Sequence, residues 1–108
     1  MDSKQKPVPG FPGRWIKLVL GENVEVGVAY LAGQVFENDL YGYLLDFKIM
    51  EEYRRRGAGK KLMAAVKSAA KREGCKRVAV MMPHEEPFSG WLQYVGFAKV
   101  GEALVMEI

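Results

Sequence analysis

The sequence is poor in cysteine and has no long apolar run. Cys75 is the one cysteine among 108 residues, so the chain cannot form an internal disulfide. It lies between Gly74 and Lys76, where a helix should give way to a strand, and we expect an ordinary half-buried thiol rather than a nucleophile. No apolar run approaches the roughly 20 residues that a membrane helix needs, and residues 1–6 lead into no apolar stretch of the signal-peptide type. These absences favour a soluble, cytoplasmic protein.

The length and composition fit one domain with one hydrophobic core. The chain is 49% hydrophobic and 27% charged, which is within the range of small globular domains. Its first thirteen residues include Pro7, Pro9 and Pro12, and prolines at this density disfavour both a helix and a central strand. We therefore expect a Pro/Gly-rich arm over residues 1–13 and a single domain over residues 14–108.

The net charge of +3 and the pI near 9.0 raise the question of a nucleic-acid partner. The basic residues form two clusters, Arg54, Arg55, Arg56, Lys60 and Lys61 first, then Lys67, Lys71, Arg72, Lys76 and Arg77. A phosphorylated small ligand explains the first cluster, and a solvated helix face explains the second. Because no aromatic stacking platform or groove-reading motif accompanies the charge, we do not expect nucleic acid as a partner.

Apolar periodicity predicts an α+β chain. Alternation and β-branched or aromatic residues predict strands, and a period of about 3.6 residues predicts helices. The expected strands cover residues 15–20, 24–32, 40–50, 78–82, 97–100 and 103–108, with turns at 21–23 and 33–39. The expected helices cover residues 57–73 and a second segment that begins near Pro87 and stops at Gly96.

Two of these segments have expected faces. Alternation in the third strand predicts one face that carries Tyr41, Tyr43, Leu45, Phe47 and Ile49. The first helix should bury one apolar stripe, namely Leu62, Met63, Val66, Ala69 and Ala70.

The junction between the third strand and the first helix carries the chemistry. At a helix start several backbone N–H groups lack partners and the helix dipole is positive, so an anion is favoured there. Gly57 and Gly59 would let a ligand approach the backbone closely, while Arg54, Arg56 and Lys60 add positive charge. A phosphate group is the natural ligand of this loop.

Spacing excludes two common phosphate-binding loops. A P-loop requires a glycine where Arg54 stands and a serine or threonine where Lys61 stands. A dinucleotide-binding fingerprint requires a third glycine at Leu62. The loop therefore belongs to neither of these two classes of phosphate-binding loop.

The stretch from Ile49 to Leu62 reads I-M-E-E-Y-R-R-R-G-A-G-K-K-L and resembles the central motif of the GNAT superfamily of N-acetyltransferases. That motif is a strand, a sequence like V-x-P-E-Y-R-G-K-G-I-G, and a helix with leucine in its first turns. The family's Gly-Phe pair after its second conserved helix is matched by Gly96 and Phe97, and its hairpin before the central strand by residues 21–27. The resemblance covers about residues 15–108. It implies a mixed, mostly antiparallel sheet of about six strands with two helices, splayed at its centre.

The resemblance also implies a cofactor site for acetyl-CoA and no metal. The backbone amides from about Arg54 to Lys60 would hold the pyrophosphate, and the edge of the third strand would pair with the pantetheine arm. The amide of Ile49 would polarise the thioester carbonyl. The implied cofactor-binding residues are Phe47, Lys48, Ile49, Arg54, Arg55, Arg56, Gly57, Ala58, Gly59 and Lys60.

The chain departs from the family where the departing thiolate needs a proton. The family often has a tyrosine four residues before the glycine of Gly-Phe, and this chain has Leu92 there. Tyr94 is about 200° further around the helix and could serve only if the helix end frays. An asparagine frequent after the fourth strand is replaced by Glu85. The remaining candidates for proton transfer are Tyr43, Asp46, His84 and Glu85.

A second departure concerns the acceptor. Family members usually begin with a strand and two helices that wall the acceptor site, and here the Pro-rich arm stands in their place. We expect either a large acceptor such as a protein or peptide amine, a second subunit in a homodimer, or a fold that retains only CoA binding. The leading hypothesis is an acetyl-CoA-dependent N-acetyltransferase for a primary amine, and the alternative is a regulatory CoA-binding module.

Overall fold

The computed structural model describes residues 13–81 and 88–108. Nearly all of the expected N-terminal arm, residues 1–12, lies outside the described residues. The same is true of Met82, expected to end a strand, and of Pro87, expected at the start of a helix.

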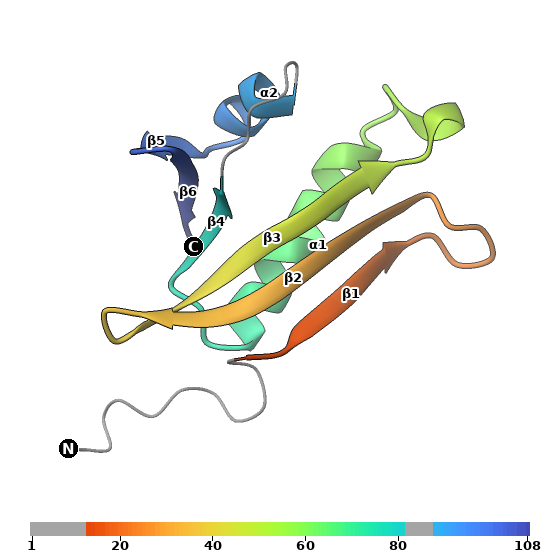
Figure 1. Cartoon of the computed structure of the whole chain (residues 1–108). Coiled ribbons are helices and arrows are strands. Elements are labelled where there is room, and N and C mark those ends of the chain that lie inside the picture. The colour runs from red at the N-terminus through yellow and green to blue at the C-terminus, as the bar shows by residue number, and fades with distance from the viewer. Residues whose placement is uncertain (1–12, 82–87) are drawn as a thin grey trace.

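One mixed sheet and two helices form the described chain (Figure 1). The strand order is β1-β2-β3-β4-β6-β5, and every neighbouring pair is antiparallel except β3 and β4. The expected α+β architecture is confirmed. The elements are β1 (Trp15–Leu20), β2 (Gly27–Phe36), β3 (Asp39–Ile49), the 3-10 turn η2 (Glu51–Tyr53), α1 (Ala58–Arg72), β4 (Arg77–Met81), α2 (Phe88–Tyr94), β5 (Ala98–Val100) and β6 (Ala103–Glu107).

The hairpin between β2 and β3 has longer strands and a shorter turn than the sequence predicts. The turn expected over residues 33–39 is only two residues, Glu37 and Asn38, whose φ angles of 52° and 71° are those of a type I′ turn. Gly33 is not part of a turn because it pairs with Gly42 inside the ladder. The connection between β1 and β2 is longer than the turn expected over residues 21–23, because β2 begins at Gly27 rather than at residue 24.

A register shift divides β3 into two halves. Tyr30 pairs with Asp46 and the next residue, Leu31, pairs with Leu44, so Leu45 is an extra residue in the β3 strand. Such a bulge bends the strand and increases its twist. The consecutive side chains of Leu45 and Asp46 are both exposed. The alternation between core and outer positions is therefore shifted by one residue after the bulge.

The face predicted for β3 is therefore wrong in its first half. Leu40 and Leu44 are buried in the core there, whereas Tyr41 and Tyr43 point to the other face. After the bulge, Phe47 and Ile49 pack on the core, so the five residues do not share one face. Strict alternation fails because the bulge adds one residue to the count.

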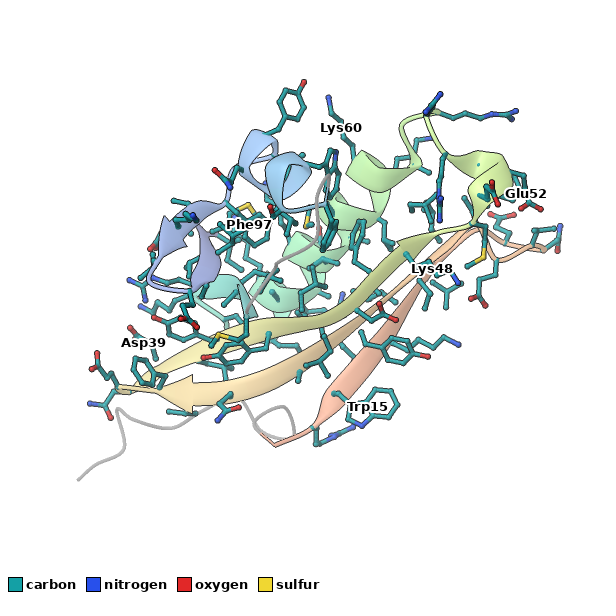
Figure 2. The ribbon with its side chains drawn as sticks, turned by 45° about the horizontal axis from the view of Figure 1, so that its top comes forward. Trp15, Asp39, Lys48, Glu52, Lys60 and Phe97 are labelled. Atoms are coloured by element: carbon teal, nitrogen blue, oxygen red, sulfur yellow. The ribbon has the colours of Figure 1, made fainter. Side chains whose placement is uncertain are left out.

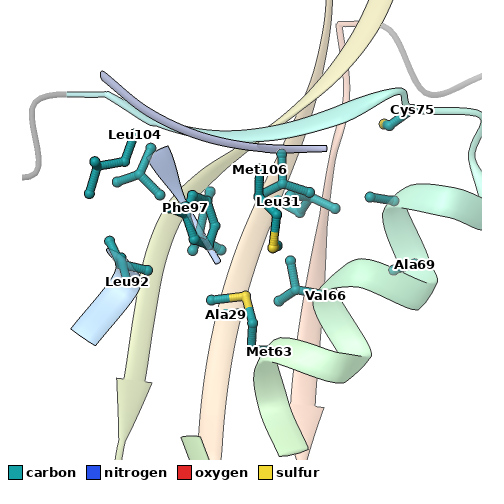
Figure 3. Packing of buried hydrophobic residues seen from close by; sticks show 14 of the residues in the cluster. Ala29, Leu31, Met63, Val66, Ala69, Cys75, Leu92, Phe97, Leu104 and Met106 are labelled. Carbon is teal, nitrogen blue, oxygen red and sulfur yellow. The ribbon is translucent and has the colours of Figure 1, made fainter. Parts of the chain in front are cut away.

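Helix α1 covers one face of the sheet over β1, β2 and β3 (Figure 1). The predicted stripe is confirmed, since Leu62, Met63, Val66, Ala69 and Ala70 are all buried. They pack with residues from the strands, α2 and the segment after α2, including Leu31, Leu92, Phe97, Leu104 and Met106 (Figure 3). Most of the buried residues of the described chain form one cluster.

The C-terminus of α1 is closed by a Schellman motif. Gly74 has a left-handed φ of 89° and donates to the Lys71 carbonyl, while the Cys75 N–H donates to the Ala70 carbonyl. The chain then turns into β4 with Cys75 buried. Burial raises the pKa of its thiol to about 11, with a smaller contribution from the Glu73 carboxylate. Cys75 is thus more buried than expected and protonated at neutral pH.

The opposite face of the sheet, called here the outer face, is aromatic. Trp15 contacts Tyr30 with ring centroids 5.5 Å apart, and Tyr41 stacks on Tyr43 at 6.0 Å. Phe36 contacts Tyr41 edge-on at the same separation. Because α1 packs on the core side, these rings lie on the side of the sheet away from it.

None of the helices in the described part of the chain is both long and apolar enough to cross a membrane.

Candidate functional site

The central strands β3 and β4 separate after a short contact. They pair in parallel only from Tyr41 to Tyr43 on β3 and from Arg77 to Ala79 on β4. Beyond this contact β3 continues with β2 to Ile49, while β4 continues with β6 to Met81. Figure 1 shows the two strands diverging toward the end of the sheet where α2 lies. The expected splay at the centre of the sheet is confirmed.

Arg77 joins the strands at the start of their short contact, on the side away from the gap. Its Nε donates to Glu107 Oε2 at 2.6 Å, and its Nη1 lies 3.2 Å from Tyr41 Oη and 3.4 Å from Asp39 Oδ2. The hydrogen bond to Glu107, more than any other interaction, raises the pKa of the guanidinium above its ordinary value. One side chain therefore connects β3, β4 and β6 at one end of the β3–β4 contact, and the gap opens at the other end, beyond Tyr43 and Ala79.

The edge of β3 that faces the gap offers backbone groups. The Met50 N–H donates to the Val26 carbonyl, and N–H groups alternate in direction along an antiparallel strand. The N–H and C=O groups of Phe47 and Ile49 therefore point away from β2 and into the gap, whereas those of Lys48 face β2. Of the three residues predicted to form this edge, Phe47 and Ile49 thus direct their backbone groups into the gap and Lys48 does not.

Two polar side chains meet this edge. Arg54 Nε donates to the Ile49 carbonyl at 2.9 Å, and Asp46 Oδ1 accepts from the Phe47 N–H at 2.9 Å. Arg54, expected to lie around a phosphate, thus contacts the strand edge in this structure. Its own backbone N–H donates to the Glu51 carbonyl and closes the η2 turn.

The start of α1 has the geometry of an anion site. The first helical hydrogen bond runs from the Lys61 N–H to the Gly57 carbonyl, so the N–H groups of Ala58, Gly59 and Lys60 precede it. Gly57, the N-cap, has a φ of 81° and open space where a Cβ would stand. No acidic residue lies in the first turn. Arg55, Arg56 and Lys60 are exposed around it, and together these features fit a pyrophosphate.

The second glycine of the loop serves packing rather than ligand approach. A Cβ at Gly59 would lie 3.2 Å from Trp91 Cζ2, so the first turn of α1 rests directly on the indole of α2. Trp91 in turn contacts Phe47 at 5.4 Å and Phe88 at 6.2 Å between ring centroids. This aromatic cluster joins the far half of β3 to α2. Sequence reasoning missed it, although Phe88 and Trp91 at helical i, i+3 spacing signal a shared face.

The residues considered for proton transfer, and Leu92 at the position of the family's frequent tyrosine, differ in their burial and in the element that carries them. Leu92, at the position of the family's frequent tyrosine, is fully buried in the core. Tyr94 is 74% exposed, and the Nζ of Lys60 lies 5.5 Å from its ring centroid. Tyr43 and Asp46 are carried by β3 on either side of the bulge. His84 and Glu85 lie outside the described residues.

Comparisons with known proteins give similar folds at low sequence identity. An IAA acetyltransferase from Bacillus cereus has a TM-score of 0.72 at 17% identity, covering 89% of this chain and 79% of that one. A PaiA N-acetyltransferase from Thermoplasma acidophilum, in complex with coenzyme A, has a TM-score of 0.69 at 15% identity, covering 87% and 61%. The NatC complex bound to Gag peptide and CoA contains a chain with a TM-score of 0.66 at 19% identity, covering 80% and 63%.

This chain thus spans about three fifths of the length of the last two structures. Comparison with curated protein sequences finds no match. The family model described as the acetyltransferase (GNAT) family matches residues 10–88, which is more than half of the sequence and includes the strand edge and the start of α1. The chain belongs to the GNAT acetyltransferase family.

Proposed function

We propose that the chain is an N-acetyltransferase that transfers an acetyl group from acetyl-CoA to a primary amine by direct attack. One observation carries the proposal: the edge of β3 at Phe47 and Ile49, which is not paired with β4, leads into the cationic start of α1. The edge suits an extended arm that contains amides, and the helix start suits a pyrophosphate. These are the two groups that link the thioester of acetyl-CoA to its nucleotide.

The residues of the gap can perform two of the required tasks. Acetyl-CoA, when bound, supplies the acetyl group as a thioester. The Ile49 N–H points into the gap and can donate to the oxyanion that develops on the carbonyl. Asp46 lies at the bulge with Oδ1 engaged by the Phe47 N–H, which leaves Oδ2 as the oxygen to accept a proton from the amine. Tyr43, on the same strand, is the other described candidate.

The aromatic outer face supports an acceptor that approaches from the side away from α1. A protein or peptide amine would bring its own wall to the site, and a second subunit would supply one for a small amine. Sedimentation velocity at several protein concentrations, with and without acetyl-CoA, separates these arrangements. A monomer at all concentrations would contradict the homodimer.

The test of the activity combines binding with turnover. Calorimetric titration with acetyl-CoA should show a single site, and release of free thiol should be accelerated by at least one member of a panel of small amines and peptide amines. Asp46→Asn should lower the rate about tenfold or more with acetyl-CoA binding unchanged. Glu37→Gln is the matched control, because it neutralises an exposed carboxylate in the turn between β2 and β3, at the opposite end of β3 from the gap.

The binding and turnover measurements distinguish the enzyme from a CoA-binding regulatory module. Absence of acetyl-CoA binding would contradict both the enzyme and any CoA-dependent role. Binding without turnover on any amine would favour the alternative, a CoA-binding regulatory module that acts through a protein partner. The buried Leu92 is the observation that supports this alternative, since it removes the hydroxyl that the family often uses to protonate the thiolate.

A further inference from the structure

Tyr94 and Lys60 form an exposed pair beside the start of α1. Tyr94 is the last residue of α2, and 74% of its surface is exposed to solvent, more than that of any other exposed large hydrophobic residue of the described chain. Lys60, in the first turn of α1, places its Nζ 5.5 Å from the Tyr94 ring centroid. Figure 2 shows the Lys60 side chain extending from the start of its helix toward solvent. We call these two residues the Tyr94–Lys60 pair.

The position of the pair is fixed by packing below it. Trp91 and Tyr94 are three residues apart on α2 and therefore share one face of that helix. The Trp91 indole lies against Gly59, and Tyr94 meets the adjacent residue, Lys60. Two contacts at consecutive positions on α1 thus hold the end of α2 beside the N–H groups that would receive the pyrophosphate.

The location matches the chemistry of the remaining part of the ligand. In coenzyme A the pyrophosphate separates the pantetheine arm from an adenosine that carries a 3′-phosphate. If the arm follows the β3 edge into the gap, the adenosine leaves the start of α1 toward solvent, where the Tyr94–Lys60 pair stands. A purine stacks on aromatic rings, and an ammonium group binds phosphate.

We propose that the Tyr94–Lys60 pair binds the nucleotide end of the coenzyme, with the purine stacked on the Tyr94 ring and Lys60 paired with the 3′-phosphate. The inference rests on the proposed function, because it takes the ligand to be a CoA thioester. It assigns Tyr94 to recognition of the cofactor by its ring, in place of proton transfer by its hydroxyl. The ammonium over one face of the ring leaves the other face for the base.

The experiment measures affinities for three ligands by calorimetry, with CoA, 3′-dephospho-CoA and 4′-phosphopantetheine as probes. Tyr94→Ala should weaken CoA about tenfold and leave 4′-phosphopantetheine, which lacks the adenosine, unchanged. Tyr94→Phe keeps the ring and should bind CoA within about twofold of the unchanged protein. Lys60→Met should reduce the preference for CoA over 3′-dephospho-CoA.

Trp15→Ala provides a matched control, since Trp15 is also an exposed aromatic residue but lies on the outer face of the sheet. Its CoA affinity should not change. Equal weakening by Tyr94→Ala and Tyr94→Phe would overturn the inference in favour of a role for the hydroxyl. Equal weakening of CoA and 4′-phosphopantetheine by Tyr94→Ala would overturn it in favour of a structural role for the ring.

The failure of this inference and the failure of the proposed function give different results. If the unchanged protein binds CoA but Tyr94→Ala binds it equally well, the pair is not the nucleotide site and the cofactor assignment stands. If the unchanged protein binds none of the three ligands, the cofactor assignment and this inference are both wrong.

Discussion

Leu92 and Tyr94 lie two residues apart on one short helix and have opposite environments. The Leu92 side chain is fully buried against the core, whereas Tyr94 stands in solvent beside Lys60. Two residues correspond to about 200° of rotation around a helix, so only one of them can face inward. The position that the family often uses for a proton donor is thus part of the core in this chain.

Leu92→Ala should therefore test packing rather than catalysis. Removing a fully buried leucine side chain leaves a cavity, and we expect the free energy of unfolding to fall by about 2–5 kcal/mol in urea titrations. Leu45→Ala is the matched control, because Leu45 is 61% exposed and its truncation should cost much less. Equal costs for the two variants would contradict the burial of Leu92.

Cys75 predicts a loss of stability at alkaline pH. Burial raises the pKa of its thiol from 9.0 to about 11, so between these values the unfolded chain loses a proton that the folded chain retains. Stability is then complete below pH 9 and falls as the pH rises toward 11, by roughly 2–3 kcal/mol for this one group. The measurement compares the pH dependence of unfolding in the unchanged protein and in Cys75→Ala. Parallel curves above pH 9 would refute the assignment, because other groups titrate there in both proteins.

At the scale of elements, the bulge in β3 determines how the central gap opens. The extra residue, Leu45, is exposed and lies just beyond the last β3 residue that pairs with β4. A bulge bends its strand and increases the local twist, which explains why β3 follows β2 while β4 follows β6. The backbone groups of Phe47 and Ile49 face the gap because the strand separates at this point.

Deletion of Leu45 should remove the bulge without burying any new polar side chain. The faces of the residues after it are unchanged, because Leu45 and Asp46 both point away from the core. We expect the far-UV circular dichroism spectrum to be retained and the affinity for CoA to fall about tenfold as β3 straightens. Leu45→Ala keeps the bulge and should bind CoA normally. A deletion variant that binds as tightly as the unchanged protein would show that the bulge does not shape the gap.

At the scale of the whole molecule, the net charge of +3 is unevenly distributed. The exposed Arg55, Arg56 and Lys60 surround the start of α1, and the other cluster lies further along the same helix and beyond it. Coulombic attraction is screened beyond about 8–10 Å at physiological ionic strength. The first cluster should therefore control anion binding, and the second should contribute little.

This distribution predicts how salt and charge reversal affect CoA binding. The affinity should fall several-fold between about 50 and 500 mM NaCl, because shorter Debye lengths screen the phosphates from the loop. Arg56→Glu should weaken CoA strongly. Lys67→Glu changes the net charge equally but lies about 13 Å further along the helix, so its effect should be small. Calorimetry at two salt concentrations provides the measurement, and equal effects of the two variants would indicate a non-specific charge effect.

The sequence by itself determined the features that depend only on residues close together in the chain. The stripe from Leu62 to Ala70 follows from the helical period, and the cationic helix start at Arg54 to Lys60 follows from neighbouring residues. The α+β class follows from the element order and the family motif.

Only the tertiary structure decided the features that depend on a partner strand or helix. The bulge at Leu45 exists because β2 pairs with both halves of β3 in different register, and it places Tyr41 and Tyr43 on the opposite face from Phe47 and Ile49. The role of Gly59 depends on where the Trp91 indole packs, and that contact joins residues more than thirty positions apart in the sequence. A sequence pattern specifies periodicity within one segment, whereas contacts between segments arise when the whole core is packed.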